Sequence, residues 1–161
     1  ATSFIVDKRA EIVRYHEDVY CATEAMGCCV FMSTAQYGLH PVNLAELFST
    51  ATGIPMTGDQ IMESGRRTVT LEKCFNVREG ATRKDDTLPY RTLYEKLPDR
   101  DEVDSTPYPE KLERMLNEYY TLHGWDLATS WPTRQVLTKL GLADVADELG
   151  AMGRLPTQGS D

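Results

Sequence analysis

The chain has 161 residues and a hydrophobic fraction of 41%, which suits a single domain with a substantial core. Its formal net charge of −8 is spread over both halves and argues against a nucleic-acid or anionic-membrane surface as a partner. No apolar run approaches the roughly 18 residues that a membrane span requires. The N-terminal residues lack the features of a signal peptide. We therefore expect a cytoplasmic protein.

Helical periodicity recurs along the chain, and no alternating β-branched run is long enough for a strand. We expect an all-α fold, an irregular domain of about five to seven helices over residues 1–149, followed by a flexible tail at 150–161. A first helix is predicted from an N-cap at Asp7 toward Met26, with Gly27 ending or bending it. The residues predicted to share its inward face are Ile12, His16, Val19, Tyr20, Thr23 and Met26.

The next two helices are predicted from capping boxes. Asn43 with Glu46 is predicted to open the second, which ends near Gly53. Thr57 with Gln60 is predicted to open the third. The residues predicted to form the apolar face of the second helix are Leu44, Leu47, Phe48 and Ala51.

The third helix is predicted to run to about Val77, with Gly80 just beyond its end. Gly65 interrupts it at some energetic cost. The residues predicted to point inward from it are Ile61, Val69, Phe75 and Cys74.

Residues 81–106 form the longest irregular stretch, which we interpret as a loop. Pro109 at a first helical position opens the next helix, and Gly124 ends it. Two short helices follow at Thr133–Leu140 and Ala143–Leu149. The buried stripe of the helix after Pro109 is predicted to hold Leu112, Met115, Leu116 and Tyr119.

Conventional catalytic and metal-binding patterns are missing from the sequence. The cysteines at 21, 28, 29 and 74 contain no Cys-x-x-Cys pair, which makes a self-contained zinc module improbable. The histidines at 16, 40 and 123 have no catalytic neighbours by spacing, and His16 is interpreted as a packed or boundary residue. No catalytic residue is predicted.

Two further groups of residues are interpreted as structural. Tyr119, Tyr120, Trp125 and Trp131 are expected in a core or a domain interface, because they recur at helical spacing. The charged run at 83–86 is interpreted as a surface cluster that neutralises itself.

The segment Glu24-Ala-Met-Gly-Cys-Cys29 combines residue types that could bind a cofactor and a metal. A carboxylate accepts paired N–H donors such as those on the edge of a pterin. Gly27 permits close approach of a ligand to the backbone. A cysteine thiolate can bind an iron–sulfur cluster, which needs four ligands, so the rest of such a site must lie elsewhere.

Several strings in one order and spacing resemble the C-terminal part of the tungsten-containing aldehyde ferredoxin oxidoreductase family. The resemblance covers roughly residues 10–148. The strings are Glu24-Ala-Met-Gly-Cys-Cys29, Thr70-Leu-Glu-Lys-Cys-Phe-Asn-Val-Arg-Glu-Gly80, Arg83-Lys-Asp-Asp-Thr-Leu-Pro-Tyr-Arg91, Tyr119-Tyr-Thr-Leu-His-Gly-Trp-Asp126 and Pro132-Thr…Leu137…Leu140-Gly-Leu142.

This resemblance implies an enzyme that holds tungsten, or molybdenum, between two pterin cofactors beside a [4Fe–4S] cluster. Such enzymes oxidise aldehydes to carboxylic acids and pass electrons to ferredoxin. An N-terminal β-rich domain supplies much of the cofactor site, and helical domains complete it and form the substrate channel. The family's relatives include the active-site subunit of a benzoyl-CoA reductase, so ring reduction of an aryl-CoA thioester is an alternative chemistry.

The family's last pterin-binding element has the pattern Asp-x-x-Gly-Leu-Cys. By this resemblance, Glu24 stands at the Asp, Gly27 at the Gly, Cys28 at the Leu and Cys29 at the Cys. Cofactor binding is thus implied for Glu24, Gly27 and Cys28, and cluster ligation for Cys29. Two departures follow, since Glu24 is one methylene longer than Asp and Cys28 introduces a second thiol beside the implied ligand.

The family's other three cluster cysteines form a Cys-x-x-Cys-x-x-x-Cys string that this sequence lacks. We therefore expect a C-terminal fragment that carries no activity or cofactor alone and that has the missing N-terminal domains as partners. A free-standing helical interaction domain is the alternative from another class. An excised cofactor domain is expected to expose an apolar patch around residues 27–32, whereas a self-sufficient module is expected to cover it.

Overall fold

The structure, a computed structural model, describes residues 8–35, 38–95 and 108–156. Seven α-helices occur in this part of the chain, which confirms the predicted all-α class. No β-strand occurs in the same ranges, where Trp125 and Pro132 form an isolated antiparallel bridge. The elements are α1 (Arg9–Ala25), the π-helix η2 (Phe31–Ala35), α2 (Pro41–Thr52), α3 (Gly58–Arg78), the 3₁₀ turn η3 (Arg83–Asp85), α4 (Tyr90–Tyr94), α5 (Tyr108–His123), α6 (Arg134–Lys139) and α7 (Ala143–Ala151).

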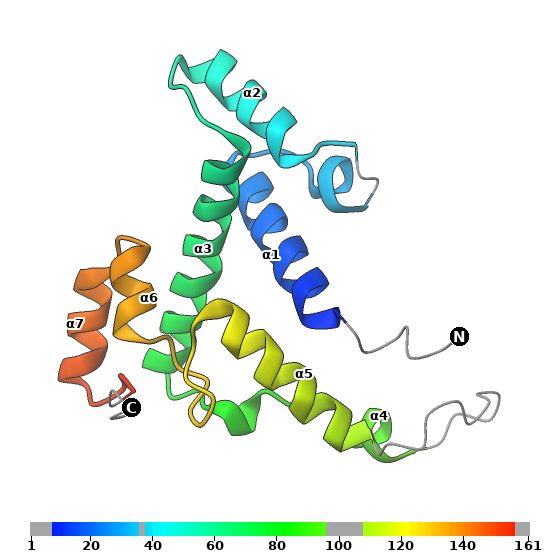
Figure 1. Cartoon of the computed structure of the whole chain (residues 1–161), viewed down its shortest axis with the longest axis vertical. Helices are drawn as coiled ribbons and strands as arrows, with labels where there is room; N and C mark the ends of the chain where they lie inside the picture. The colour runs from blue at the N-terminus through cyan, green and yellow to red at the C-terminus, as the bar shows by residue number, and fades with distance from the viewer. Residues whose placement is uncertain (1–7, 36–37, 96–107, 157–161) are drawn as a thin grey trace.

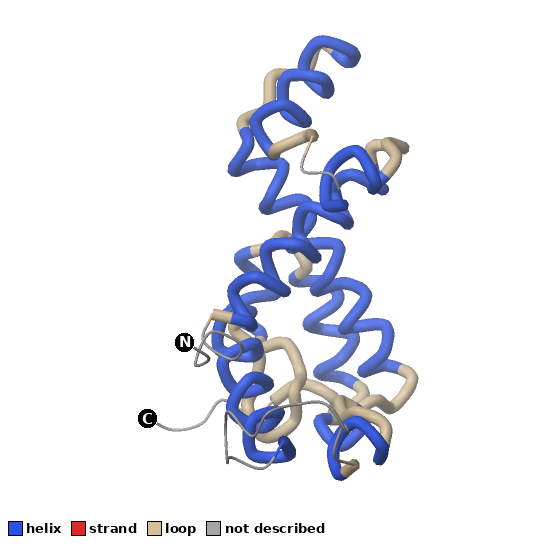
Figure 2. The backbone as a smooth tube through the Cα atoms, turned by 90° about the vertical axis from the view of Figure 1, so that its right-hand side faces the viewer, coloured by secondary structure: helices blue, strands red, loops and turns tan. Residues whose placement is uncertain are grey.

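The long helix α3 runs along much of the molecule, with α1 beside it (Figure 1). At one extremity lie α2, η2 and the C-terminal turns of α1, which we call the α2 end. At the other lie α6, α7 and the C-terminal half of α3, which we call the α7 end, and α5 packs against α1 nearby (Figure 2). Among the described helices, none is both long and apolar enough to cross a membrane.

The crossing of α1 and α3 depends on Gly65. A Cβ atom built on this glycine would lie 1.8 Å from the carbonyl oxygen of Asp18, so no other residue fits there without moving a helix. The next residue, Arg66, pairs with the Asp18 carboxylate at 3.1 Å. Gly65 therefore permits close packing of two helices, and its conformational cost within α3 is offset by that contact.

The buried face of α1 differs from the predicted one. Ile12 is 51% exposed and Tyr20 is 41% exposed, so their predicted inward positions are wrong. The residues that are buried on α1 are Ala10, Asp18, Val19, Ala22 and Thr23. Val19 and Thr23 are buried as predicted, and the additional burial of Asp18 is possible because Arg66 supplies its counter-ion. The predicted N-cap, Asp7, lies outside the described residues, and Lys8 occupies the cap position.

The two predicted capping boxes have different outcomes. The one at Thr57 is confirmed, since the Gln60 amide donates to Thr57 Oγ1 at 3.3 Å and the Thr57 amide donates to Gln60 Oε1 at 2.8 Å. The predicted start at Asn43 is wrong, because α2 already begins at Pro41. Proline suits a first helical position, where its missing N–H costs nothing. Asn43 takes part in the same cap as an acceptor for the His40 amide at 3.1 Å.

Two other predicted inward residues are exposed. Phe75 on α3 is 55% exposed and Leu47 on α2 is 48% exposed, so both predictions are wrong. The inward positions predicted for Ile61, Val69 and Cys74 on α3 are confirmed. Val77 on α3 and Ala45 on α2 are buried as well, although neither was predicted to be.

The α7 end contains the larger buried core. Its members from α3, α6, α7 and the loop between the last two are Cys74, Val77, Leu137, Leu140, Leu142, Ala146 and Leu149. The chain stays attached to this core beyond α7, because Arg154 donates to the carbonyl oxygen of Val77 at 2.9 Å and also bonds that of Arg78. The predicted tail therefore begins with residues that are held against α3, while residues 157–161 lie outside the described part.

The stretch predicted as one loop over 81–106 contains structure in its described half. Thr82 caps the turn η3 by accepting from the Lys84 amide at 3.3 Å, and α4 follows. The prediction missed α4 because five residues are too few for a helical period to emerge. Residues 96–107, the rest of that prediction, lie outside the described ranges.

Candidate functional site

The segment from Glu24 to Cys29 begins as the end of α1. The Cys28 amide donates to the Thr23 carbonyl oxygen at 3.1 Å, and the Gly27 amide donates to the Glu24 carbonyl oxygen at 2.8 Å. With Gly27 at φ 72°, these bonds form a Schellman motif. The predicted ending at Gly27 is confirmed, and the helix terminus directs the two cysteines away from the axis of α1. Equivalent bond pairs end four other helices at Gly80, Gly124, Gly141 and Gly153.

Cys29 lies on the surface, and Cys28 is half-buried. Directly after them, Phe31 is 65% exposed and Met32 is 52% exposed, so an apolar patch lies where the sequence predicted one for an excised cofactor domain. Nothing lies within 4 Å of a Cβ built on Gly27, which leaves open space over this backbone. Within 8–35, 38–95 and 108–156, no three His, Cys, Asp or Glu side chains are grouped to hold a metal ion.

Glu24 has a different environment from the cysteines. Its carboxylate lies close enough to the Tyr20 hydroxyl to raise the pKa of that phenol. Glu24 lines a cleft of about 520 Å³ together with His16, Tyr20 and Cys21, but neither Cys28 nor Cys29 lines it. The structure thus joins Glu24 and Cys29 through one helix terminus without bringing their side chains into a common pocket.

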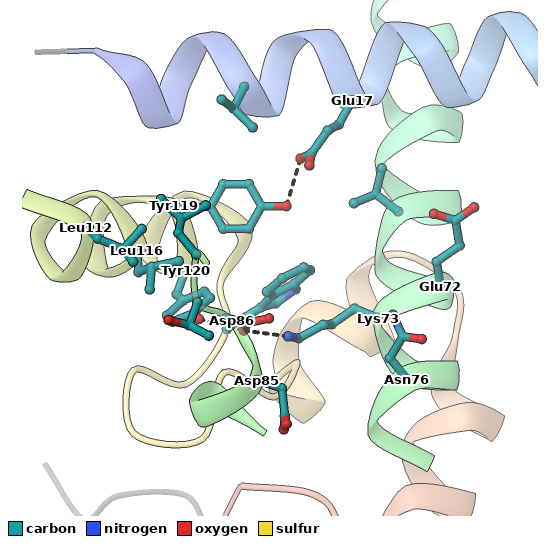
Figure 3. A pocket seen from close by; sticks show the side chains of 15 residues that line it. Glu17, Glu72, Lys73, Asn76, Asp85, Asp86, Leu112, Leu116, Tyr119 and Tyr120 are labelled. Atoms are coloured by element: carbon teal, nitrogen blue, oxygen red, sulfur yellow. Dashed lines mark hydrogen bonds and ion pairs between the residues drawn. The ribbon is translucent and has the colours of Figure 1, made fainter. Parts of the chain in front are cut away.

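A second cleft, of about 530 Å³, lies between α1, α3 and α5, and we call it the α1/α3/α5 cleft. Figure 3 shows Glu17 pointing from α1 toward Tyr119 on α5, with Lys73 reaching from α3 toward Asp86. The lining residues are Val13, Glu17, Val69, Glu72, Lys73, Asn76, Asp85, Asp86, Thr87, Leu88, Leu112, Leu116, Tyr119, Tyr120 and Trp125.

Asp86 is the best-held carboxylate of this cleft. It accepts hydrogen bonds from the Tyr120 hydroxyl at 2.6 Å and from Lys73 Nζ at 2.9 Å. Burial by itself would raise the pKa of Asp86, but these two donors outweigh burial and lower it. Burial and the Asp86 carboxylate together raise the pKa of Tyr120. The side chain of Asp86 is therefore an ionised anchor between α3 and α5.

Glu17 links α1 to α5 in a similar way. The Tyr119 hydroxyl donates to Glu17 Oε2 at 2.7 Å, and His123 Nε2 lies 3.7 Å from the same oxygen. His123 is buried at the last position of α5, between the rings of Tyr119 and Trp125 at centroid distances of 4.4 and 4.5 Å. Sequence spacing gave His123 no acidic neighbour, because Glu17 is more than a hundred positions away.

The charged run at 83–86 is not a self-neutralising cluster. Arg83 pairs with Glu113 on α5 at 2.5 Å and donates to the Leu127 carbonyl oxygen at 2.6 Å. Asp86 pairs with Lys73, as described above. The strings at 83–91 and 119–126 are in direct contact, because the Tyr120 hydroxyl donates to Asp86. Their joint appearance among the strings that carry the family resemblance is the sequence feature that could have indicated this contact.

The comparisons with known proteins agree with these strings. The family model described as "Aldehyde ferredoxin oxidoreductase, domains 2 & 3" matches residues 2–142. The tungsten-containing aldehyde ferredoxin oxidoreductase of Pyrococcus horikoshii is 30% identical over 141 residues, and that of Pyrococcus furiosus is 28% identical over the same length. Each alignment covers 87% of this chain and 22% of the relative.

A solved structure shows the same fold. The active-site complex BamBC of benzoyl-coenzyme A reductase, in complex with 1,5-dienoyl-CoA, superposes with a TM-score of 0.78 at 27% sequence identity. The match covers 94% of this chain and 22% of that one.

An all-α domain with these strings, matched over most of its length, belongs to the aldehyde ferredoxin oxidoreductase family. The chain spans about a fifth of the length of the relatives that it matches.

Proposed function

We propose that this chain is the C-terminal helical part of a tungsten-pterin oxidoreductase that converts aldehydes to carboxylic acids and passes electrons to ferredoxin. The observation that carries the proposal is the match to the family over residues 2–142. Cys29, which by the sequence resemblance corresponds to the family's last cluster cysteine, is exposed. Relatives at 28–30% identity bear the name of this tungsten enzyme. The remaining domains, a cytoplasmic location and ferredoxin as the acceptor belong to the same proposal.

The residues present fit one edge of a cofactor site. Cys29 offers an exposed thiol, and the backbone at Gly27 has open space above it. In the enzyme, Cys29 would hold one iron of a [4Fe–4S] cluster, and Glu24 with the backbone at Gly27 and Cys28 would contact a pterin. When bound, the tungsten-pterin centre and the cluster supply the redox chemistry.

This chain's own contribution is placement and exclusion of water. The Schellman turn fixes where the backbone after Gly27 leaves α1, so Cys29 is positioned by a helix terminus. Phe31 and Met32, which follow Cys29 directly in the chain, and Val42 on α2 expose apolar side chains at the same end of the molecule, and we call these the apolar face of the α2 end. Apolar side chains gathered on one surface often mark a contact with another part of a protein. We infer that the missing domains of the same enzyme cover them and keep water from the cluster.

A benzoyl-CoA reductase-type parent is the second candidate. The specific observation in its favour is the TM-score of 0.78 with a subunit complex that holds a dienoyl-CoA. Its chemistry would be ring reduction of an aryl-CoA thioester. The described residues that we propose at the cofactor would serve both chemistries, because they would contact the cofactor and not the substrate.

The experiment that tests the leading candidate uses the full-length enzyme encoded around this chain. Elemental analysis is expected to find tungsten and iron, and the enzyme is expected to oxidise aldehydes with a ferredoxin or a viologen dye as acceptor. Turnover of benzoyl-CoA without aldehyde oxidation would select the second candidate. A full-length protein without tungsten, molybdenum or iron would refute both. The isolated chain is expected to bind essentially no iron or tungsten, since one thiolate cannot hold a cluster.

A further inference from the structure

We propose that the α1/α3/α5 cleft receives a segment of the remaining part of the same enzyme, which inserts a lysine or arginine side chain. This inference rests on the proposed function, which makes the chain one part of a longer polypeptide. It adds a second contact surface to the apolar face at the α2 end, and it specifies the chemistry of the partner.

Carboxylates outnumber cations on the walls of the cleft. Glu17, Glu72, Asp85 and Asp86 line it, and Lys73 is the one lysine or arginine that lines it in the described part. Lys73 forms an ion pair with Asp86 at 2.9 Å. The Asp85 carboxylate accepts hydrogen bonds from the backbone amide and the hydroxyl of Thr82, which caps η3. Among the described residues, no lysine or arginine pairs with Glu72. The wall between α1 and α3 therefore carries negative charge, of which the Glu72 carboxylate is exposed to solvent and has no lysine or arginine partner among the described residues.

A neighbouring thiol responds to this charge. Cys21 lines the adjoining cleft, which shares Glu17, Val69 and Glu72 with the first. Its pKa is raised to about 11, first by burial and then by the carboxylates of Glu72, Glu24 and Glu17. A cation seated between the two helices would meet an attractive field from several carboxylates at once.

The cleft also offers a preoriented carboxylate beside aromatic rings. Tyr119 fixes one oxygen of Glu17 at 2.7 Å, and the ring of Tyr119 packs edge-on against Trp125 at 5.6 Å between centroids. Leu112 and Leu116 continue the apolar lining. A charged head on an apolar stem, as in lysine or arginine, matches acidic walls and an apolar floor.

The part of the enzyme outside this chain is the source of the occupant. The chain spans about a fifth of the length of its relatives, so most of the polypeptide is available to pack against the cleft. The described carboxylates are not grouped to hold a metal ion. A lysine or arginine side chain on a packed segment therefore matches the charge of the cleft.

Zero-length cross-linking of the full-length enzyme tests the contact directly. A carbodiimide joins a carboxylate to an ammonium group that touches it, and mass spectrometry of the digest identifies the pair. We expect Glu72 or Glu17 to be linked to a lysine outside this chain in the same polypeptide. Glu63, exposed on the same helix α3 but outside the cleft, is the internal control and is expected to give no such link. A link from Glu72 to a second copy of the enzyme would overturn the proposal.

A substitution that removes the negative charge tests the same contact if the inserted residue is arginine, which a carbodiimide does not cross-link. Glu72→Gln is expected to lower the Tm of the full-length enzyme by several degrees but to leave the isolated chain unchanged or slightly more stable. Glu63→Gln is expected to change neither. Equal responses of the two proteins to Glu72→Gln, without a cross-link, would refute the proposed contact. Tungsten and iron content, measured on the same samples, reports separately on the proposed function.

Discussion

The two ends of the molecule are built differently. At the α7 end, seven side chains from α3, α6, α7 and the loop between the last two bury each other to 6% exposure or less. At the α2 end, the buried cluster of Val19, Ala22, Leu44, Ala45 and Ile61 is made largely of smaller groups. Five further apolar side chains of that end, Phe31, Met32, Val42, Leu47 and Ile54, are exposed. The α7 end thus has the larger closed core, although Phe75 is exposed on its surface, whereas the α2 end has a smaller core and more exposed apolar side chains.

Truncating the core of the α7 end is expected to have the largest effect on the isolated chain. Leu137 is fully buried between α6 and its neighbours, so Leu137→Ala should lose about 2–5 kcal/mol of unfolding free energy. Urea unfolding followed by circular dichroism measures the change. A loss below about 1 kcal/mol would mean that the α7 end is loosely packed and that the two ends differ less than we describe.

Closing the space at Gly65 is expected to have the next largest effect. In Gly65→Ala, the new methyl would meet the Asp18 carbonyl oxygen, so α1 and α3 must separate at a cost of about 1–3 kcal/mol. Gly150→Ala in α7 is the matched control, because its Cβ would meet the flexible end of Arg134 at 3.2 Å and make an ordinary contact with Leu155 at 3.9 Å. The control is expected to be neutral or to gain up to about 1 kcal/mol from helix propensity. Similar destabilisation by both substitutions would contradict the close crossing.

Removing the charge of Asp86 tests the anchor between α3 and α5. Asp86→Asn should cost about 1–3 kcal/mol near neutral pH, because a charged acceptor for Tyr120 and Lys73 is lost. The folded-state pKa of Asp86 is lowered, so its contribution is fully present above the ordinary aspartate pKa of about 3.9 and is lost as the pH falls through the lowered pKa.

The pH dependence of the same variant provides the check. Between about pH 5 and pH 2, the stability of the wild-type chain should approach that of Asp86→Asn as the carboxyl group becomes protonated. A difference between the two proteins that stays constant over this range would show that Asp86 acts through packing and not through its charge.

The smallest effect in the isolated chain is expected at the α2 end. Phe31 is 65% exposed, so Phe31→Ser should change the unfolding free energy by no more than about 0.5 kcal/mol. The same substitution in the full-length enzyme should weaken the contact with the missing domains and lower its Tm or its iron content. A large loss in the isolated chain, or no loss in the full-length enzyme, would contradict the difference that we draw between the ends.

Local rules of the sequence predicted the helices well where glycines and caps mark their ends. The capping box at Thr57 and the ending at Gly27 follow from backbone chemistry within a few residues, so both are readable without a tertiary structure. The burial of Asp18 is different in kind, because it depends on Arg66, which is 48 positions away. From the sequence alone, Gly65 is only a residue of low helix propensity within α3. Its role in the close packing of α1 is visible only in the structure.

The candidate site also has one part that the sequence could reveal and one part that it could not. The Glu24 to Cys29 segment could be singled out because its chemistry and its family pattern lie within six residues. The α1/α3/α5 cleft could not, because Glu17, Lys73, Asp86 and Trp125 come from four separate stretches of the chain. Their side chains meet only after α1, α3 and α5 have packed. The charged run at 83–86 illustrates the point, since its partners lie on α3 and α5 and not within the run.

We propose that Cys29 supplies one thiolate to an iron–sulfur cluster in the full-length enzyme. The most direct measurement compares Cys29→Ser with Cys28→Ser by iron analysis and visible absorption of the full-length protein. We expect Cys29→Ser to lose most of the cluster iron and its absorption, while Cys28→Ser retains both. Full cluster content in Cys29→Ser, or loss confined to Cys28→Ser, would contradict the claim.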